Sequence, residues 1–235
     1  MDALGSGLKE GLRLLLSGDP YLWEVILLSA KVSGIALLIS ALIGIPLGAF
    51  LGLAHFPGRR IAQALIYTGM GLPPVVVGLA VYILLSRKGI LGPMNLSWVP
   101  ELFTVPAMIV AQVIIATPLV IGYTMSSVAE VDPNLRLQVR ALGATPLQVT
   151  WAILREARQG VLVALVGGLG SIISEIGAVM MVGGNIEHST RVLTTAIMLE
   201  TRRGNFDLAI GLGLVLLLCA FIINLAATQL QGKGK

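Results

Sequence analysis

Five long stretches with almost no charged residues constrain this chain more than any other feature of its sequence. Four of them contain no Asp, Glu, Lys or Arg, and the remaining one, residues 159–186, contains one glutamate. They are residues 32–54, 61–86, 102–129, 159–186 and 208–232, of 23, 26, 28, 28 and 25 residues. A helix needs about 20 apolar residues to cross a bilayer, so each stretch suffices for one crossing and none for two. We therefore predict an all-α membrane protein with five transmembrane helices.

The overall composition excludes a water-soluble fold. Charged residues make up 12% of the 235, and hydrophobic residues make up 56%; a soluble domain has roughly 25% charged residues. The net charge of +4 would suggest a nucleic-acid partner in a soluble protein. Here we expect Lys and Arg to lie at the membrane faces, with no nucleic acid bound. His55 and His188 fall in loops predicted on opposite sides of the membrane, so we expect no metal site.

Five crossings place the termini on opposite sides of a cell (inner) membrane. With the N-terminus outside and the C-terminus inside, eight Lys and Arg residues fall in the inner segments 55–60, 130–158 and 233–235, against seven outside. Arg59 and Arg60, in a loop of six residues, favour the same orientation by the positive-inside rule. We divide the chain into an outer amphipathic segment at 1–21, a transmembrane domain at 22–230 and a cytoplasmic tail at 231–235.

Small residues and prolines inside the stretches predict how the helices pack. Gly44, Gly48 and Gly52 form a row on one helix face. Such rows let two backbones approach closely in lipid, either within one chain or across a dimer. Pro73 and Pro74 are adjacent and predict the sharpest helix break. That break is either a structural kink or part of a transport pathway, as in the discontinuous helices of transporters.

Glu175 is the one carboxylate inside these five stretches. An ionisable group at membrane depth is costly and indicates function by default. The alternative is a structural carboxylate that is protonated or paired locally. A channel or a proton-coupled secondary transporter that uses Glu175 is therefore a second hypothesis for the whole chain.

The segment 130–158 between the third and fourth stretches is too ordered for a simple connector. Asp132 before Pro133 predicts the start of a helix, and Gly143 predicts its end. The residues from Thr145 to Gln148 match a capping box and predict the start of a second helix. The first helix has an apolar stripe of Leu135, Val139 and Leu142 and, on another face, Arg136 and Arg140. It is either an interfacial helix on lipid headgroups or a docking element for a cytoplasmic protein.

This segment also resembles a known family. Residues 140–146, Arg-Ala-Leu-Gly-Ala-Thr-Pro, with Ile153 ten residues after Gly143, resemble the cytoplasmic EAA loop of ABC-importer permeases, whose pattern is E-A-A-x3-G-x9-I-x-L-P. Leu-Gln-Val stands at 137–139 in place of E-A-A, and Arg-Glu stands in place of the final L-P. Residues 72–79, 173–186 and 190–197 are similar to permeases for oxyanions, and to the tungstate type in particular.

The resemblance, which covers residues 25–230, implies a type I importer permease that carries an oxyanion inward, tungstate or else molybdate or sulfate. It also implies two copies of this chain, cytoplasmic ATPase subunits and an extracytoplasmic oxyanion-binding protein. The sequence has no G-x-x-x-x-G-K-[ST] phosphate loop, so ATP binding and hydrolysis are expected in the partner ATPase. We accordingly expect no catalytic residue and no cofactor in this chain.

Two groups of functional residues follow from the loop and the resemblance. The residues expected to couple to the ATPase are Leu135, Arg136, Val139, Arg140, Leu142, Gly143, Ala144 and Thr145. The residues expected to line or gate the pathway are Pro73, Pro74, Ser171, Ser174, Glu175 and Asn185. Because a carboxylate repels an anion, we expect Glu175 to act in gating or in structure rather than as a direct ligand.

Overall fold

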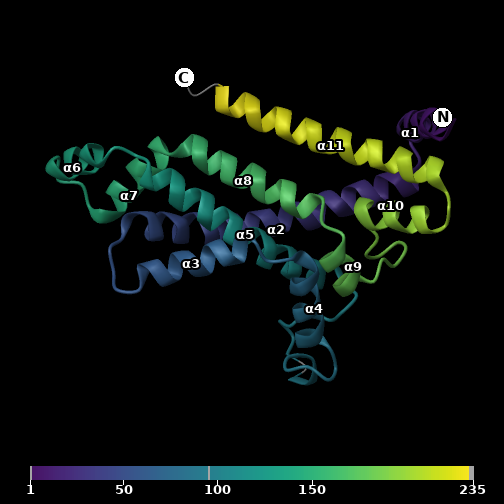
Figure 1. The fold of residues 1–235 in the computed structure, drawn as a ribbon, viewed down its shortest axis with the longest axis horizontal. Coiled ribbons are helices and arrows are strands. Elements are labelled where there is room, and N and C mark those ends of the chain that lie inside the picture. The colour runs from purple at the N-terminus through teal and green to yellow at the C-terminus, as the bar shows by residue number, and fades with distance from the viewer. Residues whose placement is uncertain (1, 95, 233–235) are drawn as a thin grey trace.

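The computed structural model describes residues 2–94 and 96–232, and within these ranges it contains helices and no strand (Figure 1). This agrees with the predicted all-α class. The last residues of the predicted tail, Lys233 to Lys235, lie outside the described part. The elements are α1 (Asp2–Ser17), α2 (Pro20–Leu53), α3 (Arg59–Met70), α4 (Pro74–Leu85), the 3-10 helix η1 (Gly92–Met94), α5 (Val105–Ala129), α6 (Pro133–Ala141), α7 (Pro146–Glu156), α8 (Arg158–Ile173), α9 (Gly177–Gly183), α10 (Leu193–Arg202) and α11 (Phe206–Gly232).

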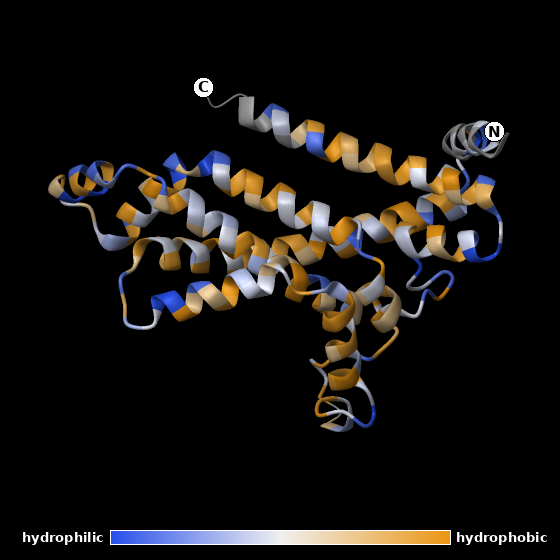
Figure 2. Cartoon of the chain, in the orientation of Figure 1, coloured by the Kyte–Doolittle hydropathy of each residue, from blue (hydrophilic) through white to orange (hydrophobic). Residues whose placement is uncertain are grey.

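Three helices, α2, α5 and α11, are each long and apolar enough to cross a membrane. Two further crossings result if each of the bent pairs α3–α4 and α7–α8 forms one, which gives up to five. Figure 2 shows hydrophobic residues along the middle of the long helices and hydrophilic residues at loops and helix ends. The number of crossings, up to five, therefore agrees with the prediction, although the pair α7–α8 includes a helix from the segment 130–158, which was predicted to lie between two crossings.

Two of the five uncharged stretches, however, do not form one continuous helix. The stretch 61–86 breaks between Met70 and Pro74, where α3 and α4 are bent by 98°. Proline fixes φ and has no N–H to donate, so the chain restarts its helix at Pro74. The stretch 159–186 breaks after Ile173, and α9 begins at Gly177. Glu175 thus lies at a helix break and not inside a helix. Such irregular backbone is tolerated within a membrane-spanning segment where protein surrounds it.

The core of the molecule is the packing of α2 against α5. The glycine row of α2 faces α5 along its whole length: a Cβ on Gly48 would lie 2.7 Å from the Ile121 carbonyl oxygen, and one on Gly52 would lie 2.9 Å from the Met125 carbonyl oxygen. Gly44 faces Val120 in the same way. The structure therefore uses this row within the chain.

The start of α1 and the end of α11 lie toward opposite ends of the molecule (Figure 1). One end, which we call the α6 end, carries α6, α7 and the loop between α2 and α3. The other, the α1 end, carries α1 and α10. Most of the predicted amphipathic segment forms α1, which packs on α11. A Cβ on Gly11 would lie 3.2 Å from the Gly211 Cα, and the Ser6 hydroxyl donates to Asp207.

Candidate coupling loop and translocation pathway

The helix-glycine-helix arrangement predicted for residues 130–158 is confirmed by the structure. The Asp132 carboxylate accepts a hydrogen bond from the Asn134 N–H at 2.9 Å and starts α6. Gly143 has φ +83°, the left-handed conformation that ends a helix. Thr145 and Gln148 form a reciprocal capping box, with the Thr145 N–H donating to Gln148 Oε1 at 2.8 Å.

One face of this loop is packed onto the helix bundle. Val149 and Ile153 of α7 are 3% and 2% exposed and contact Ala49 of α2 and Val128 of α5. Val139 and Ala144, both expected coupling residues, are half-buried at the edge of the same cluster, although the sequence did not place them against the bundle. The loop is therefore packed against the ends of α2 and α5 and is not a simple connector.

The opposite face of the loop is an exposed apolar surface. Leu142 is 87% exposed and Leu147 is 80% exposed. Between α6 and α7 lies a cavity of about 560 Å³ lined by Leu135, Leu147, Gln148, Trp151, Ala152, Arg155 and Glu156. We define the apolar docking face as Leu137, Leu142, Leu147 and Trp151. An apolar surface of this kind marks a site of interaction with protein or lipid.

This surface corrects the apolar stripe expected on the first helix. Leu142 lies beyond the last residue of α6 and points away from the bundle, whereas Leu135 and Val139 are half-buried. The stripe is split because the helix ends one residue before Leu142. Leu147 and Trp151 are not among the expected coupling residues, although their i, i+4 spacing in the first two turns of the second helix predicts one apolar face.

The two arginines expected together on α6 have different surroundings. Arg140 is exposed. Arg136 is half-buried, and its Nη1 donates to the carbonyl oxygen of Leu53 at 3.0 Å. Arg136 therefore faces the end of α2 and not the solvent.

The two helix breaks at membrane depth lie against each other. Val75 directly follows the proline pair, and a Cβ on Gly177 would come within 2.6 Å of the Val75 Cγ2. One turn further along, Gly78 of α4 packs on Ala178 of α9. The structure thus packs the residues that follow Pro73 and Pro74 against those that follow Glu175, although the two segments are about a hundred residues apart in the sequence.

Side chains satisfy the irregular backbone at the α8–α9 break. The Glu175 side chain accepts the Ala178 N–H at 2.8 Å through Oε1 and is buried, with the residue 9% exposed. The Thr194 hydroxyl of α10 donates to the Glu175 carbonyl oxygen at 2.9 Å, and Gln112 of α5 donates to the Ile172 carbonyl oxygen at 3.1 Å. No sequence pattern placed Thr194 or Gln112 at this break, because only the fold brings them there.

The remaining expected pathway residues are dispersed along α8 and α9. Ser171 is half-buried on α8, and the exposed Ser174 donates its hydroxyl to the Gly170 carbonyl oxygen at 2.8 Å. Asn185 lies just past α9 with φ 53°, and its Oδ1 is buried without a hydrogen-bond partner in the described part of the chain. Asn185 is therefore at the opposite end of α9 from Glu175.

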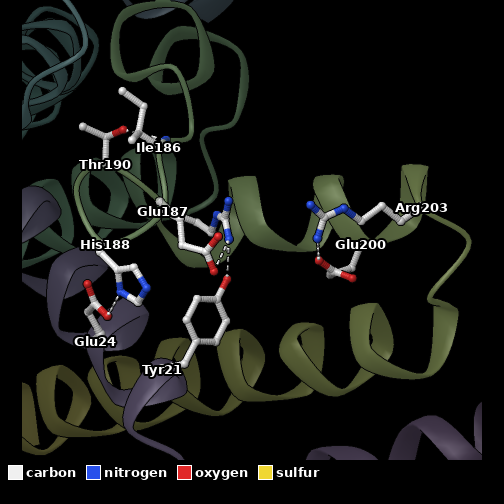
Figure 3. A network of polar contacts seen from close by, with 9 residues as sticks. Tyr21, Glu24, Ile186, Glu187, His188, Thr190, Glu200 and Arg203 are labelled. Carbon is white, nitrogen blue, oxygen red and sulfur yellow. Dashed lines mark hydrogen bonds and ion pairs between the residues drawn. The ribbon is translucent and has the colours of Figure 1, made fainter.

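A polar network joins the loop after α9 to the start of α2 (Figure 3). Arg191, 8% exposed, donates to the Tyr21 hydroxyl at 3.0 Å and pairs with Glu187 at 3.3 Å. His188 contacts Glu24 at 2.8 Å. Arg191 is therefore buried and bound to two side chains of the protein, unlike a loop arginine that is surrounded by solvent.

Comparison with known proteins places the chain among transport proteins. A family model described as "Binding-protein-dependent transport system inner membrane component" matches residues 44–233. The tungstate uptake system permease protein TupB of Peptoclostridium acidaminophilum is 41% identical over 98% of this chain and 99% of its own length. The protein of the same name in Campylobacter jejuni is 35% identical over 98% and 95%. The molybdenum transport system permease protein ModB of Escherichia coli K12 is 29% identical over 74% and 78%.

Solved structures show the same fold at low sequence identity. A bacterial ABC transporter that imports the acidic polysaccharide alginate has a chain that matches with a TM-score of 0.75 and 20% identity, over 97% of this chain and 84% of that one. The inward-facing MetNI methionine ABC transporter matches with a TM-score of 0.69 and 20% identity, over 89% and 92%. The chain therefore belongs to the binding-protein-dependent transport system inner membrane components, the permease subunits of ABC importers.

Proposed function

We propose that this permease carries tungstate inward across the cell membrane, driven by ATP that a separate subunit hydrolyses. The observation that carries the proposal is the 41% identity to a tungstate permease over nearly the whole of both chains. The molybdenum permease of E. coli is similar over 74% of the chain, and a sulfate permease of Synechocystis is 29% identical over 78%. The gradient in identity and coverage favours tungstate over the other two oxyanions.

The working unit is proposed to hold two copies of the chain, cytoplasmic ATPase subunits and an extracytoplasmic oxyanion-binding protein. The apolar docking face supports an ATPase at the α6 end, because four large apolar side chains there are exposed. The cavity between α6 and α7 can receive a partner side chain. In the proposed N-out, C-in orientation, this face lies in the cytoplasm.

In the proposed cycle, closure of the ATPases displaces the coupling loop. Because Val149 and Ile153 pack on the ends of α2 and α5, the displacement rocks the bundle as a rigid body. The gate is the contact between the two broken segments, α3–α4 and α8–α9. Pro73, Pro74, Ser171, Ser174 and Asn185 are proposed to line or shape the pathway, and Glu175 to hold the gate backbone.

The hypothesis of a channel or a proton-coupled carrier is not supported by the relatives described above. The Glu175 carboxylate is also engaged with the Ala178 N–H inside the same segment. A residue that holds its own backbone this way is suited to a structural role.

Reconstitution tests the proposal. The permease, its ATPase and its binding protein are placed in vesicles, and tungstate uptake is measured with ATP, with ADP, and with a proton gradient and no nucleotide. We expect uptake only with ATP and the binding protein, and stronger competition by unlabelled tungstate than by molybdate or sulfate. Uptake driven by the proton gradient alone would overturn the importer mechanism, and equal competition would overturn the choice of tungstate.

Cysteine labelling tests the orientation. Leu142 at the α6 end and Ser97 in the loop between α4 and α5 are both exposed. In intact cells, a membrane-impermeant maleimide should label Ser97→Cys and spare Leu142→Cys until the membrane is opened. The reverse pattern would place the coupling loop outside.

A further inference from the structure

The C-terminal end of α2 is held by two arginines that come from different elements. Arg59, at the start of α3, donates from Nε to the Leu51 carbonyl oxygen at 2.9 Å and from Nη2 to the Gly52 carbonyl oxygen at 3.1 Å. Arg136, in α6, donates to the Leu53 carbonyl oxygen at 3.0 Å. The last carbonyls of a helix lack partners within it and form the negative end of its dipole, so cations bind well there.

The Arg136 contact spans 83 residues of sequence. It joins α6 directly to the end of α2, whereas the backbone of α6 packs on α7. The Arg136 Nε is buried and has no hydrogen-bond partner in the described part of the chain, so this side of the guanidinium is turned toward the protein. An arginine that served only to bind a partner would point outward, as the exposed Arg140 does.

We infer that Arg136 is a positioning residue that transmits displacement of the coupling helix to α2. The inference rests on the proposed function and adds the side chain through which that motion passes. The apolar contacts of Val149 and Ile153 hold the loop against the bundle, and the charge-assisted hydrogen bond of Arg136 adds a constraint on both distance and direction. The close packing of α2 on α5 along Gly44, Gly48 and Gly52 then carries the displacement into the bundle.

Arg59 provides the comparison that separates transmission from simple capping. It caps carbonyls of the same helix end but comes from α3, outside the coupling loop. If capping is all that matters, loss of Arg59 and loss of Arg136 should have the same consequences. If Arg136 transmits motion, only its loss should separate ATP hydrolysis from transport.

The experiment uses the complete transporter in vesicles and measures tungstate taken up per ATP hydrolysed, together with thermal unfolding and retention of the ATPase subunits. Arg136→Met keeps the length of the side chain and removes its donors, and Arg136→Lys keeps one charged donor. Arg59→Met is the capping comparison, and the exposed Arg60→Met is the control for loss of a positive charge at this end. We expect Arg136→Met to lower the uptake per ATP about tenfold, the scale of one hydrogen bond to a charged group.

Arg136→Lys should recover a large part of that ratio, while Arg59→Met should lower the unfolding temperature and leave the ratio near the wild-type value. Arg60→Met should change neither. Equal ratios in the Met and Lys variants of Arg136, or a normal ratio in Arg136→Met, would overturn the inference. Loss of the ATPase subunits from Arg136→Met alone would also overturn it, because Arg136 would then belong to the docking contact. Failure of the wild-type transporter to use ATP would instead count against the proposed function.

Discussion

Gly78 of α4 lies directly against Ala178 of α9, so closely that a Cβ on Gly78 would come within 2.5 Å of the Ala178 Cα. Each residue belongs to the second half of a broken segment, and the contact joins the two breaks. No side chain larger than hydrogen fits at position 78 without moving one of the helices. This contact sets the distance between the two halves of the proposed gate.

Gly78→Ala should therefore force α4 and α9 apart. Overpacking of this kind costs about 1–3 kcal/mol of stability, and tungstate uptake should fall with it. Thermal unfolding in detergent and vesicle uptake measure the two effects. Gly34→Ala on α2 is the matched control, because nothing lies within 4 Å of a Cβ there. Identical behaviour of the two variants would show that the contact has no part in transport.

Gly143→Val should separate ATP hydrolysis from transport while the protein stays inserted. The residue has φ +83° and nothing within 4 Å of a Cβ, so the penalty is conformational, about 1–2 kcal/mol for a left-handed residue. Gly58→Val, at φ +87° and equally open, imposes the same backbone penalty outside the coupling loop. The uptake per ATP should drop in the first variant and hold in the second. A normal ratio in both would remove the reason to treat residues 130–158 as a lever.

Glu175→Gln should leave uptake almost unchanged, whereas Glu175→Leu should lower it several-fold. A glutamine oxygen can still accept the Ala178 N–H that Glu175 binds at 2.8 Å, and leucine cannot. The loss of such a cap costs about 1 kcal/mol. Uptake by the two variants at matched expression decides the question. A large loss with glutamine would show that the charge itself is needed and would revive proton coupling.

Thr194→Val should destabilise the α8–α9 break. Valine has the shape of threonine but cannot donate to the Glu175 carbonyl oxygen, which would be left unpaired in a buried position. We expect a cost of about 1–3 kcal/mol, read as a lower unfolding temperature and reduced uptake. Thr201→Val is the control on the same helix, because the Thr201 hydroxyl bonds only to its own helix and is exposed. A smaller effect at Thr194 than at Thr201 would contradict the assigned role.

The features that could be predicted from sequence are those specified by neighbouring residues. Both helices of the coupling loop are predictable from sequence, because their ends are set by Asp132, Gly143 and the pair Thr145–Gln148. Each of these acts within one helical turn. The membrane class and the number of uncharged stretches are equally local, because they depend on the absence of charge along about 20 consecutive residues. Pro73 and Pro74 likewise marked a break that the structure contains.

Tertiary structure decided everything that depends on which segments meet. The row of Gly44, Gly48 and Gly52 specifies close approach but no partner, and only the fold shows that α5 occupies it. The break at Glu175 was invisible in the sequence, since the polar backbone exposed there is satisfied by Thr194 and Gln112 from other helices. The sequence groups Arg136 with Arg140 as expected coupling residues, and only the fold brings Arg136 to the end of α2. In each case the deciding interaction joins residues that are distant in sequence. A pattern of neighbouring residues does not specify which distant segments meet in space.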